Sequence, residues 1–150
     1  MKEYKIYLSG GMMKFGSDNF DEGNKWRVYC RQALENCESP YRVKTFNPNM
    51  YFSFKSDAPE YSSETEVMRF DLYNLRKSDL VIVNYNDKKS LGTTSEVAIA
   101  YDRGIPVIAL NEDNGEIHPW LRCMPERIFN NIDEMLDYIQ DFYLRWWRII

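Results

Sequence analysis

Two short apolar runs constrain the fold of this chain more than any other feature of its sequence. They lie inside the segments "DLVIVNY" and "PVIAL", and within each run the side chains are continuously apolar. That pattern is typical of strands buried on both faces, as in a parallel sheet with helices on each side. With two further apolar runs bounded by glycine, proline or asparagine, we predict strands over residues 5–8, 42–46, 80–84 and 106–110.

Segments with helical spacing lie between the predicted strands. Apolar residues recur every three or four positions from Trp26 to Cys37, and Ser17 or Asp18 is the expected N-cap. Further helices are expected over 64–77 and 94–103, the second ended by Gly104. This alternation predicts a single α/β domain over residues 1–150, Rossmann-like or flavodoxin-like, with a mostly parallel sheet flanked by helices.

A last helix is expected over residues 133–148. Its apolar positions form one stripe made by Ile132, Met135, Leu136, Ile139, Phe142, Tyr143 and Trp146. With the tail "RWWRII", this aromatic stripe favours self-association, so a homodimer or higher homo-oligomer is expected.

Composition excludes several classes of protein. Because 19 Lys and Arg face 23 Asp and Glu, the chain has no electrostatic footprint for nucleic acid or for an anionic membrane. No apolar run approaches the roughly 20 residues that a membrane span needs. Three cysteines without a Cys-x-x-Cys pair argue against disulfides and favour the cytoplasm. A single histidine cannot build an ordinary zinc site, and "SGGMM" is no dinucleotide fingerprint, so neither metal nor cofactor is expected.

The loops that leave the predicted strands define where a ligand should bind. In open α/β sheets ligands lie beyond the carboxyl ends of the strands, and the loops there read "SGGMM", "NPNMY", "NDKKSLGTT" and "NEDNGEIHP". Ser9, Gly10 and Gly11 in the first loop would let a ligand approach the backbone closely. The third loop leads straight into the helix that carries Glu96. Its first turn would present this carboxylate to the same rim, where the helix dipole favours the ionised form.

Two carboxylates stand out as candidate catalytic groups. Thr93-x-x-Glu96 also fits a capping box, and on spacing alone the capping role is favoured. Asp71 shifts the balance, because it falls with Met68 and Leu72 on the helical stripe expected to face the interior. A buried acid there is either structurally hydrogen-bonded or used in chemistry. An ionised carboxylate beside one with a raised pKa is the arrangement of glycosyl transfer.

The segments "KIYLSGGM", "DLYNLRKSDLVIVNYND" and "SLGTTSEVAIAYDRGIPVIAL" together resemble the nucleoside 2-deoxyribosyltransferase family, which includes nucleoside 5′-monophosphate N-glycosidases. The resemblance implies a Rossmann-like sheet, an oligomer, and cleavage of the N-glycosidic bond of small nucleosides or nucleotides. It implies that Glu96 is the nucleophile, that Asp71 is the acid near base and sugar, and that the Tyr7 hydroxyl orients the glutamate. The loop with Gly92 and Thr93 would seat the substrate.

Ser90 bears on the choice of substrate. In the transferases of this family an aspartate commonly stands six residues before the glutamate, whereas the monophosphate N-glycosidases have a serine that contacts the 5′-phosphate. Ser90, with Lys88 and Lys89 beside it, resembles the second group, although a solvated turn with surface lysines is the alternative.

Three further residues are candidate substrate contacts. Asn47 binds sugar hydroxyls or makes a turn, and Asn84 at a strand end has the same two interpretations. His118 either reaches the phosphate of a neighbouring subunit or lies on the surface.

The sequence therefore predicts an enzyme that cleaves a (deoxy)nucleoside 5′-monophosphate through a covalent glycosyl-Glu96 intermediate resolved by water. Exchange of bases on 2′-deoxynucleosides is the alternative reaction. A non-catalytic nucleotide-binding or sensing module is the alternative class.

Overall fold

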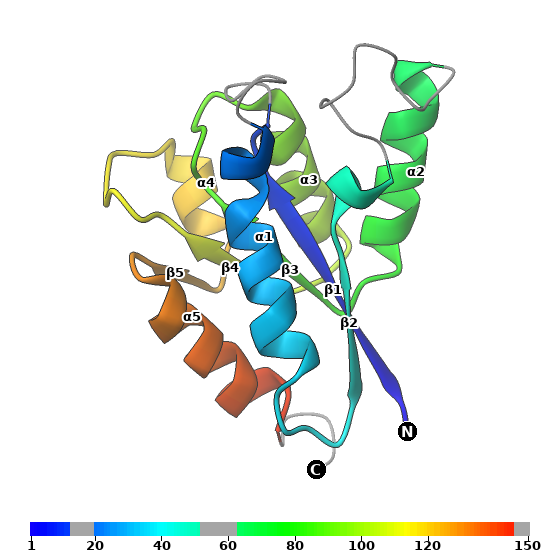
Figure 1. Ribbon diagram of the computed structural model, residues 1–150. Coiled ribbons are helices and arrows are strands. Elements are labelled where there is room, and N and C mark those ends of the chain that lie inside the picture. The colour runs from blue at the N-terminus through cyan, green and yellow to red at the C-terminus, as the bar shows by residue number, and fades with distance from the viewer. Residues whose placement is uncertain (13–19, 52–62, 146–150) are drawn as a thin grey trace.

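The computed structural model describes residues 1–12, 20–51 and 63–145, and these residues form an α/β sandwich (Figure 1). Five parallel strands pair in the order β2-β1-β3-β4-β5. The strands are β1 (Glu3–Gly10), β2 (Arg42–Phe46), β3 (Leu80–Asn84), β4 (Val107–Leu110) and β5 (Arg127–Phe129). The predicted fold class is confirmed, and the strand order is the flavodoxin-like one, with its switch point between β1 and β3.

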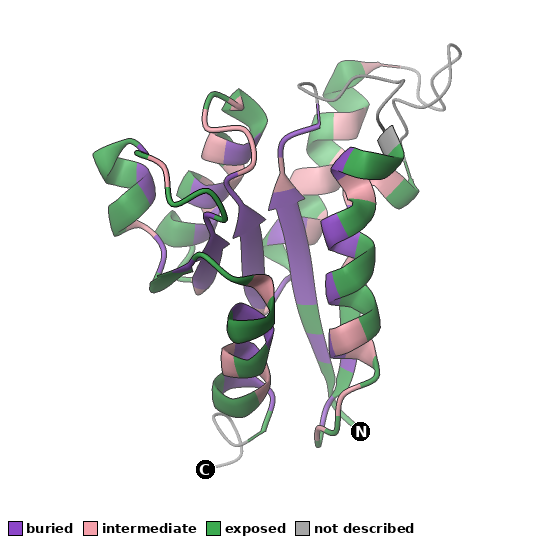
Figure 2. Ribbon diagram, turned by 60° about the vertical axis from the view of Figure 1, so that its left-hand side comes forward, coloured by how far each residue is buried: buried purple, intermediate pink, exposed green. Residues whose placement is uncertain are grey.

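Helices cover both faces of the sheet (Figure 1). They are α1 (Phe20–Glu35), α2 (Glu64–Arg76), α3 (Leu91–Asp102), α4 (Pro119–Cys123) and α5 (Ile132–Tyr138), with a 3-10 turn at Pro48–Met50 and a π-helical turn at Ile139–Tyr143. One apolar core joins α1 and α5 to the sheet, and a second lies on the opposite face under α2, α3 and α4. Figure 2 shows the strands buried between these layers.

Strand β1 contributes side chains to both cores, and its alternation decides which residues reach the site. Ile6 and Leu8 point into the core under α1 and α5, whereas Tyr7 points into the core under α2 and α3. Because side chains alternate along a strand, Ser9 follows Tyr7 to the α3 side.

Two elements escaped the sequence patterns. Strand β5 has three residues, of which only Phe129 is buried, and α4 has five, so neither shows a full period of its pattern. The start of α3 at Leu91 is three residues earlier than predicted, because Ser90 caps the helix.

Part of the stripe predicted for the last helix is core, whereas Phe142 is 42% exposed. Met135, Leu136, Ile139 and Tyr143 are buried against the sheet. The expected N-cap at Ser17 or Asp18, and residues 146–150 with Trp146 and most of the tail, lie outside the described residues. In the described part of the chain no helix combines the length and the apolar character that a bilayer crossing requires.

Candidate active site

Glu96 lies on α3 with both carboxylate oxygens held by hydroxyl groups from β1. The Tyr7 hydroxyl donates a hydrogen bond to Oε2, and the Ser9 hydroxyl donates one to Oε1 over 2.8 Å. Tyr7 and Ser9 reach the same carboxylate because they are two residues apart on one strand. The structure therefore brings these three predicted site residues together at the carboxyl end of β1.

The capping-box interpretation of Glu96 is wrong. The N-cap of α3 is Ser90, whose hydroxyl accepts from the backbone N–H of Thr93 at 3.2 Å. Glu96 is the sixth residue of the helix, so it lies beyond the first turn, and the dipole has little effect there. Burial raises the pKa of Glu96, while the hydrogen bonds from Tyr7 and Ser9 and the charge of Arg27 oppose that rise. The predicted dipole stabilisation is thus replaced by hydroxyl donors.

Asp71 lies on α2 with its Oδ1 atom buried and without a hydrogen-bond partner in the described residues. Burial and the negative charge of Glu96 raise the pKa of Asp71 to about 7, and the charge of Arg27 opposes that rise. A carboxyl with this pKa holds a proton in much of the population near neutrality and can donate it. Met68, expected on the same interior stripe, is largely exposed.

An aromatic cluster flanks this pair of acids. Phe46 stacks on Tyr7 with ring centroids 5.2 Å apart and on Tyr51 at 5.1 Å, and Phe70, the residue before Asp71, tilts against both Phe46 and Tyr51. The cluster comes from separate elements of the chain, so no local pattern predicts it.

Arg27 on α1 is the functional candidate that the sequence reasoning missed. Its side chain is 2% exposed, and its guanidinium donates to the carbonyl of Gly10 at 2.7 Å and, more weakly, to that of Leu8 at 3.4 Å. Pairing of β1 with β2 ends at Tyr7 and Phe46, so these two carbonyls have no strand partner on that side. Arg27 therefore fixes the backbone on both sides of Ser9. An arginine on the face of α1 that also carries Trp26 and Cys30 was the available signal.

The two glycines after β1 allow close packing within the protein. A Cβ on Gly10 would lie 2.8 Å from Cζ2 of Trp26, and a Cβ on Gly11 would lie 2.6 Å from Cβ of Asp87. The Gly11 N–H donates to Oδ1 of Asn86 at 3.0 Å, which ties the first loop to the third. The glycines thus set the shape of the rim, in addition to the ligand approach predicted for them.

Most polar groups in the loop before α3 interact with other groups of the protein. Besides capping, the Ser90 hydroxyl donates to Oγ1 of Thr93 at 2.9 Å. The Lys88 ammonium forms an ion pair with Asp113 at 2.8 Å, whereas Lys89 is exposed. Gly92 is exposed, with open space where a Cβ would lie. Ser90 therefore belongs to a hydrogen-bonded turn, and of its two neighbouring lysines Lys89 is exposed while Lys88 is ion-paired.

Three predicted substrate contacts do not converge on Glu96. Asn47 is the N-cap of the 3-10 turn and its amide donates to Asn24, so it makes the turn offered as its alternative. Asn84 points to the α1 side of the sheet, opposite Glu96. His118 is exposed and accepts from the Trp120 N–H as the N-cap of α4. In the described ranges no group of three or more His, Cys, Asp or Glu is placed to hold a metal ion.

Comparison with known proteins defines the class to which this fold and site belong. Residues 6–138 match the family model described as nucleoside 2-deoxyribosyltransferase. The chain therefore belongs to the nucleoside 2-deoxyribosyltransferase family, whose members are transferases or N-glycosidases acting on small nucleosides or nucleotides. No curated protein sequence matches the chain significantly.

Solved structures share the fold at low sequence identity. A conserved protein from Enterococcus faecalis V583 superposes with a TM-score of 0.71 at 18% identity, covering 93% of this chain and 98% of that one. The 2-deoxyribosyltransferase of Bacillus psychrosaccharolyticus gives 0.68 at 19% identity, covering 89% and 91%. The CMP N-glycosidase BcmB of Clostridium botulinum gives 0.59 at 16% identity, covering 92% and 99%. These similarities show the fold alone, and the neighbours include both kinds of enzyme.

Proposed function

We propose that this protein cleaves the N-glycosidic bond of a (deoxy)nucleoside 5′-monophosphate through a glycosyl-Glu96 intermediate that water resolves. The observation that carries the proposal is the Glu96 carboxylate held by two hydroxyls beside a second carboxyl whose pKa is about 7. One group is fixed for attack and the other holds a proton for the leaving base. That division of labour is what double displacement at a sugar carbon requires.

The reaction proceeds in two balanced steps. In the first step, an oxygen of Glu96 forms a bond to C1′ while the C1′–N bond breaks. The electron pair of the C1′–N bond stays on the base, and the base takes the proton of Asp71. Water then attacks C1′, loses a proton to Asp71 and releases Glu96, with retention at C1′. Hydrogen bonds from Tyr7 and Ser9 orient Glu96 throughout.

The monophosphate preference rests on the start of α3. Ser90 precedes Glu96 by six residues, which is about 9 Å along a helix axis, the scale of a ribose with its 5′ phosphate. The first N–H groups of a helix lack intrahelical partners and attract anions, and the exposed Lys89 adds positive charge. We propose that the phosphate binds here beside Gly92, with Ser90 retaining its cap.

We also propose a cytoplasmic homodimer. The free cysteines Cys30, Cys37 and Cys123 support a reducing compartment. Large apolar side chains exposed on the α3 and α4 side, Leu91 at 83% and Trp120 at 73%, support an association surface there. His118, next to Trp120 in this surface, is then placed to approach the site of the partner copy.

Free base released from nucleoside 5′-monophosphates and from the matching nucleosides, separated by chromatography, tests the proposal. Glu96→Gln should abolish release, and Glu134→Gln, which changes an exposed glutamate on α5, should leave it unchanged. Release from monophosphates that is unaffected by added base supports the hydrolase. Base exchange on unphosphorylated deoxynucleosides would instead establish the transferase.

The non-catalytic alternative has its own signature in the same assay. A sensing module would release no base from any substrate, and Glu96→Gln would leave its nucleotide binding unchanged. Binding of a monophosphate without any Glu96-dependent release of base therefore identifies an inactive binder, whereas release that is lost in Glu96→Gln identifies an enzyme.

A further inference from the structure

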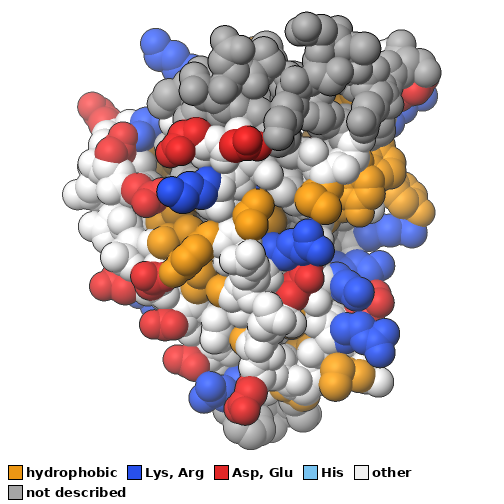
Figure 3. Space-filling view, viewed as in Figure 1, with side chains coloured by type: hydrophobic (Ala, Val, Ile, Leu, Met, Phe, Trp, Pro, Cys, Tyr) orange, Lys and Arg blue, Asp and Glu red, His pale blue; other side chains and the backbone are white. Residues whose placement is uncertain are grey.

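A recess separate from the Glu96 site lies on the opposite side of the sheet, between α1, α5 and the loops after β3 and β4. It has a volume of about 370 Å³, and its walls include Trp26 and Tyr29 from α1, Asn84 from β3 and Ile132 from α5. The size falls in the lower part of the roughly 300–1,000 Å³ range of small-molecule sites. Figure 3 shows this face, where apolar side chains beside α1 are bordered by charged ones.

Asn84 is the unusual member of this wall. Its side chain is only 3% exposed and lines the recess. The Nε1 atom of Trp26, in the same wall, is buried without a hydrogen-bond partner in the described residues. The recess thus combines the amide side chain of Asn84 with the aromatic side chains of Trp26 and Tyr29.

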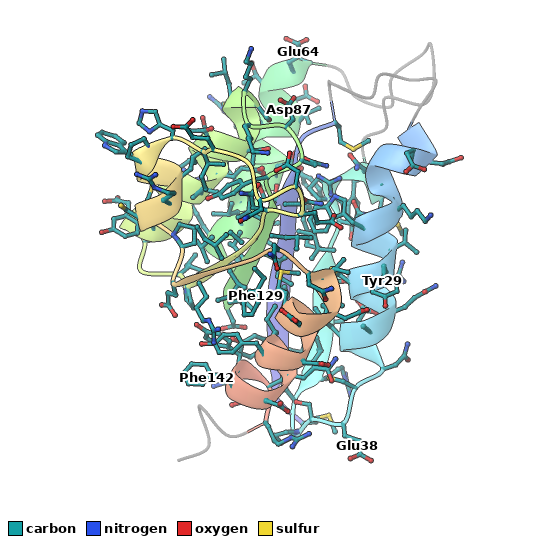
Figure 4. The ribbon with its side chains drawn as sticks, turned by 90° about the vertical axis from the view of Figure 1, so that its left-hand side faces the viewer. Tyr29, Glu38, Glu64, Asp87, Phe129 and Phe142 are labelled. Atoms are coloured by element: carbon teal, nitrogen blue, oxygen red, sulfur yellow. The ribbon has the colours of Figure 1, made fainter. Side chains whose placement is uncertain are left out.

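The rest of the recess is lined by charged and polar groups as well as apolar ones. The Tyr29 hydroxyl donates to Oδ1 of Asp133 at 2.6 Å, which links α1 to α5. Figure 4 labels Tyr29 on α1, next to α5. The rim carries two carboxylates, Glu22 and Glu112, and one ammonium, Lys25. Because the carboxylates outnumber the ammonium, the rim disfavours an anionic ligand such as a phosphate.

A side-chain amide presents a donor and an acceptor next to each other. It therefore pairs in a two-point manner with a planar edge that offers the complementary acceptor and donor, as asparagine does with adenine. Aromatic walls favour a planar ring in the same place. We propose that this recess is a second small-molecule site, which binds an uncharged nitrogen heterocycle of the nucleobase type through Asn84. The site goes beyond the proposed reaction and does not depend on it, since it is defined by binding alone.

Isothermal titration with free adenine and with free cytosine tests the proposal, because a free base has no glycosidic bond that the protein could cleave. Asn84→Leu removes the amide at similar volume and should weaken binding of a free base about tenfold, the lower end of what a two-point pair contributes. Asn84→Asp keeps an acceptor but loses the donor, so it should weaken binding too, and it serves if the leucine variant does not fold. Asp71→Asn should leave this binding unchanged.

Three outcomes would overturn the proposal. They are no measurable binding of either base, equal binding by the wild type and both Asn84 variants, and binding lost in Asp71→Asn but kept in the Asn84 variants. The last would place the base in the Glu96 site. Because the titration records no turnover, its failure is distinct from a failure of Glu96→Gln to abolish base release.

Discussion

Replacing Asp71 by asparagine should make the protein more stable and inactive at the same time. Burial and the charge of Glu96 raise the pKa of Asp71 from 3.8 to about 7. The folded protein therefore binds a proton on Asp71 more tightly than the unfolded chain does. The contribution of Asp71 to the free energy of unfolding is therefore fully present below the pKa that Asp71 has in the unfolded chain. It falls as the pH rises from about 4 to about 7 and is lowest above pH 7.

The size of the effect follows from that shift. About three pKa units would correspond to about 4 kcal/mol if Asp71 were fully enclosed. Because the side chain is only partly buried, solvent screening reduces the expected penalty to about 1–2 kcal/mol above pH 7. Asparagine carries no charge, so Asp71→Asn should gain that amount at pH 8 and little at pH 4.

Urea unfolding of the wild type and Asp71→Asn at pH 4 and pH 8 measures this difference directly. Asp137→Asn, an exposed aspartate on α5, is the matched control and should show no pH-dependent gain. Base release should fall at least about a hundredfold in Asp71→Asn, because general-acid catalysis is lost. A variant less stable than the wild type at pH 8, or one that keeps its turnover, would refute the reasoning.

Three further substitutions probe the site. Tyr7→Phe should lower kcat about tenfold to a hundredfold while its ring keeps packing on Phe46; a pH–rate profile should show the acid limb at higher pH, and an unchanged profile would contradict the orienting role. Arg27→Met should also move the acid limb to higher pH, because the positive charge that lowers the pKa of Glu96 is lost. Arg27→Lys keeps a positive charge and should shift the limb less. If the pH–rate profiles of Arg27→Met and the wild type are equal, the role of Arg27 is purely structural. Ser90→Ala should lower the free energy of unfolding, measured in urea, by about 1 kcal/mol because the helix cap is lost. It should also raise the KM for monophosphates more than the KM for nucleosides, and an equal rise in both would contradict the phosphate site.

The sheet was predictable because its signal is local. Strand β3 is buried along its whole length, and it and the helices around it show their periods in single segments of sequence. Strand β5 was not predicted, because its three residues at the edge of the sheet are too few to show either a continuous apolar run or an alternation of apolar and polar residues.

The candidate site was predictable only in part. Position along the chain indicated that Glu96 and Ser9 would share a rim, and the family resemblance implied that Tyr7 orients Glu96. The hydrogen bonds from Tyr7 and Ser9 to Glu96 show that the three residues meet. Spacing could not show that Ser90 caps the helix in place of Thr93, because both residues carry a hydroxyl that can cap. Arg27 was missed because its partners are backbone carbonyls of β1 that lie beyond the end of β2. The pattern of side chains in the sequence does not show where a neighbouring strand ends.

Side chains of β1 alternate between the two faces of the sheet, and this limits insertions and deletions within the strand during evolution. Its even residues Ile6 and Leu8 fill one core, while its odd residues Tyr7 and Ser9 hold the carboxylate on the other face. Deleting one residue within the strand would exchange the two sets, burying hydroxyls under α1 and pointing leucine at Glu96. Homologous chains should therefore accept substitutions in β1 but show their insertions and deletions in the loops outside it.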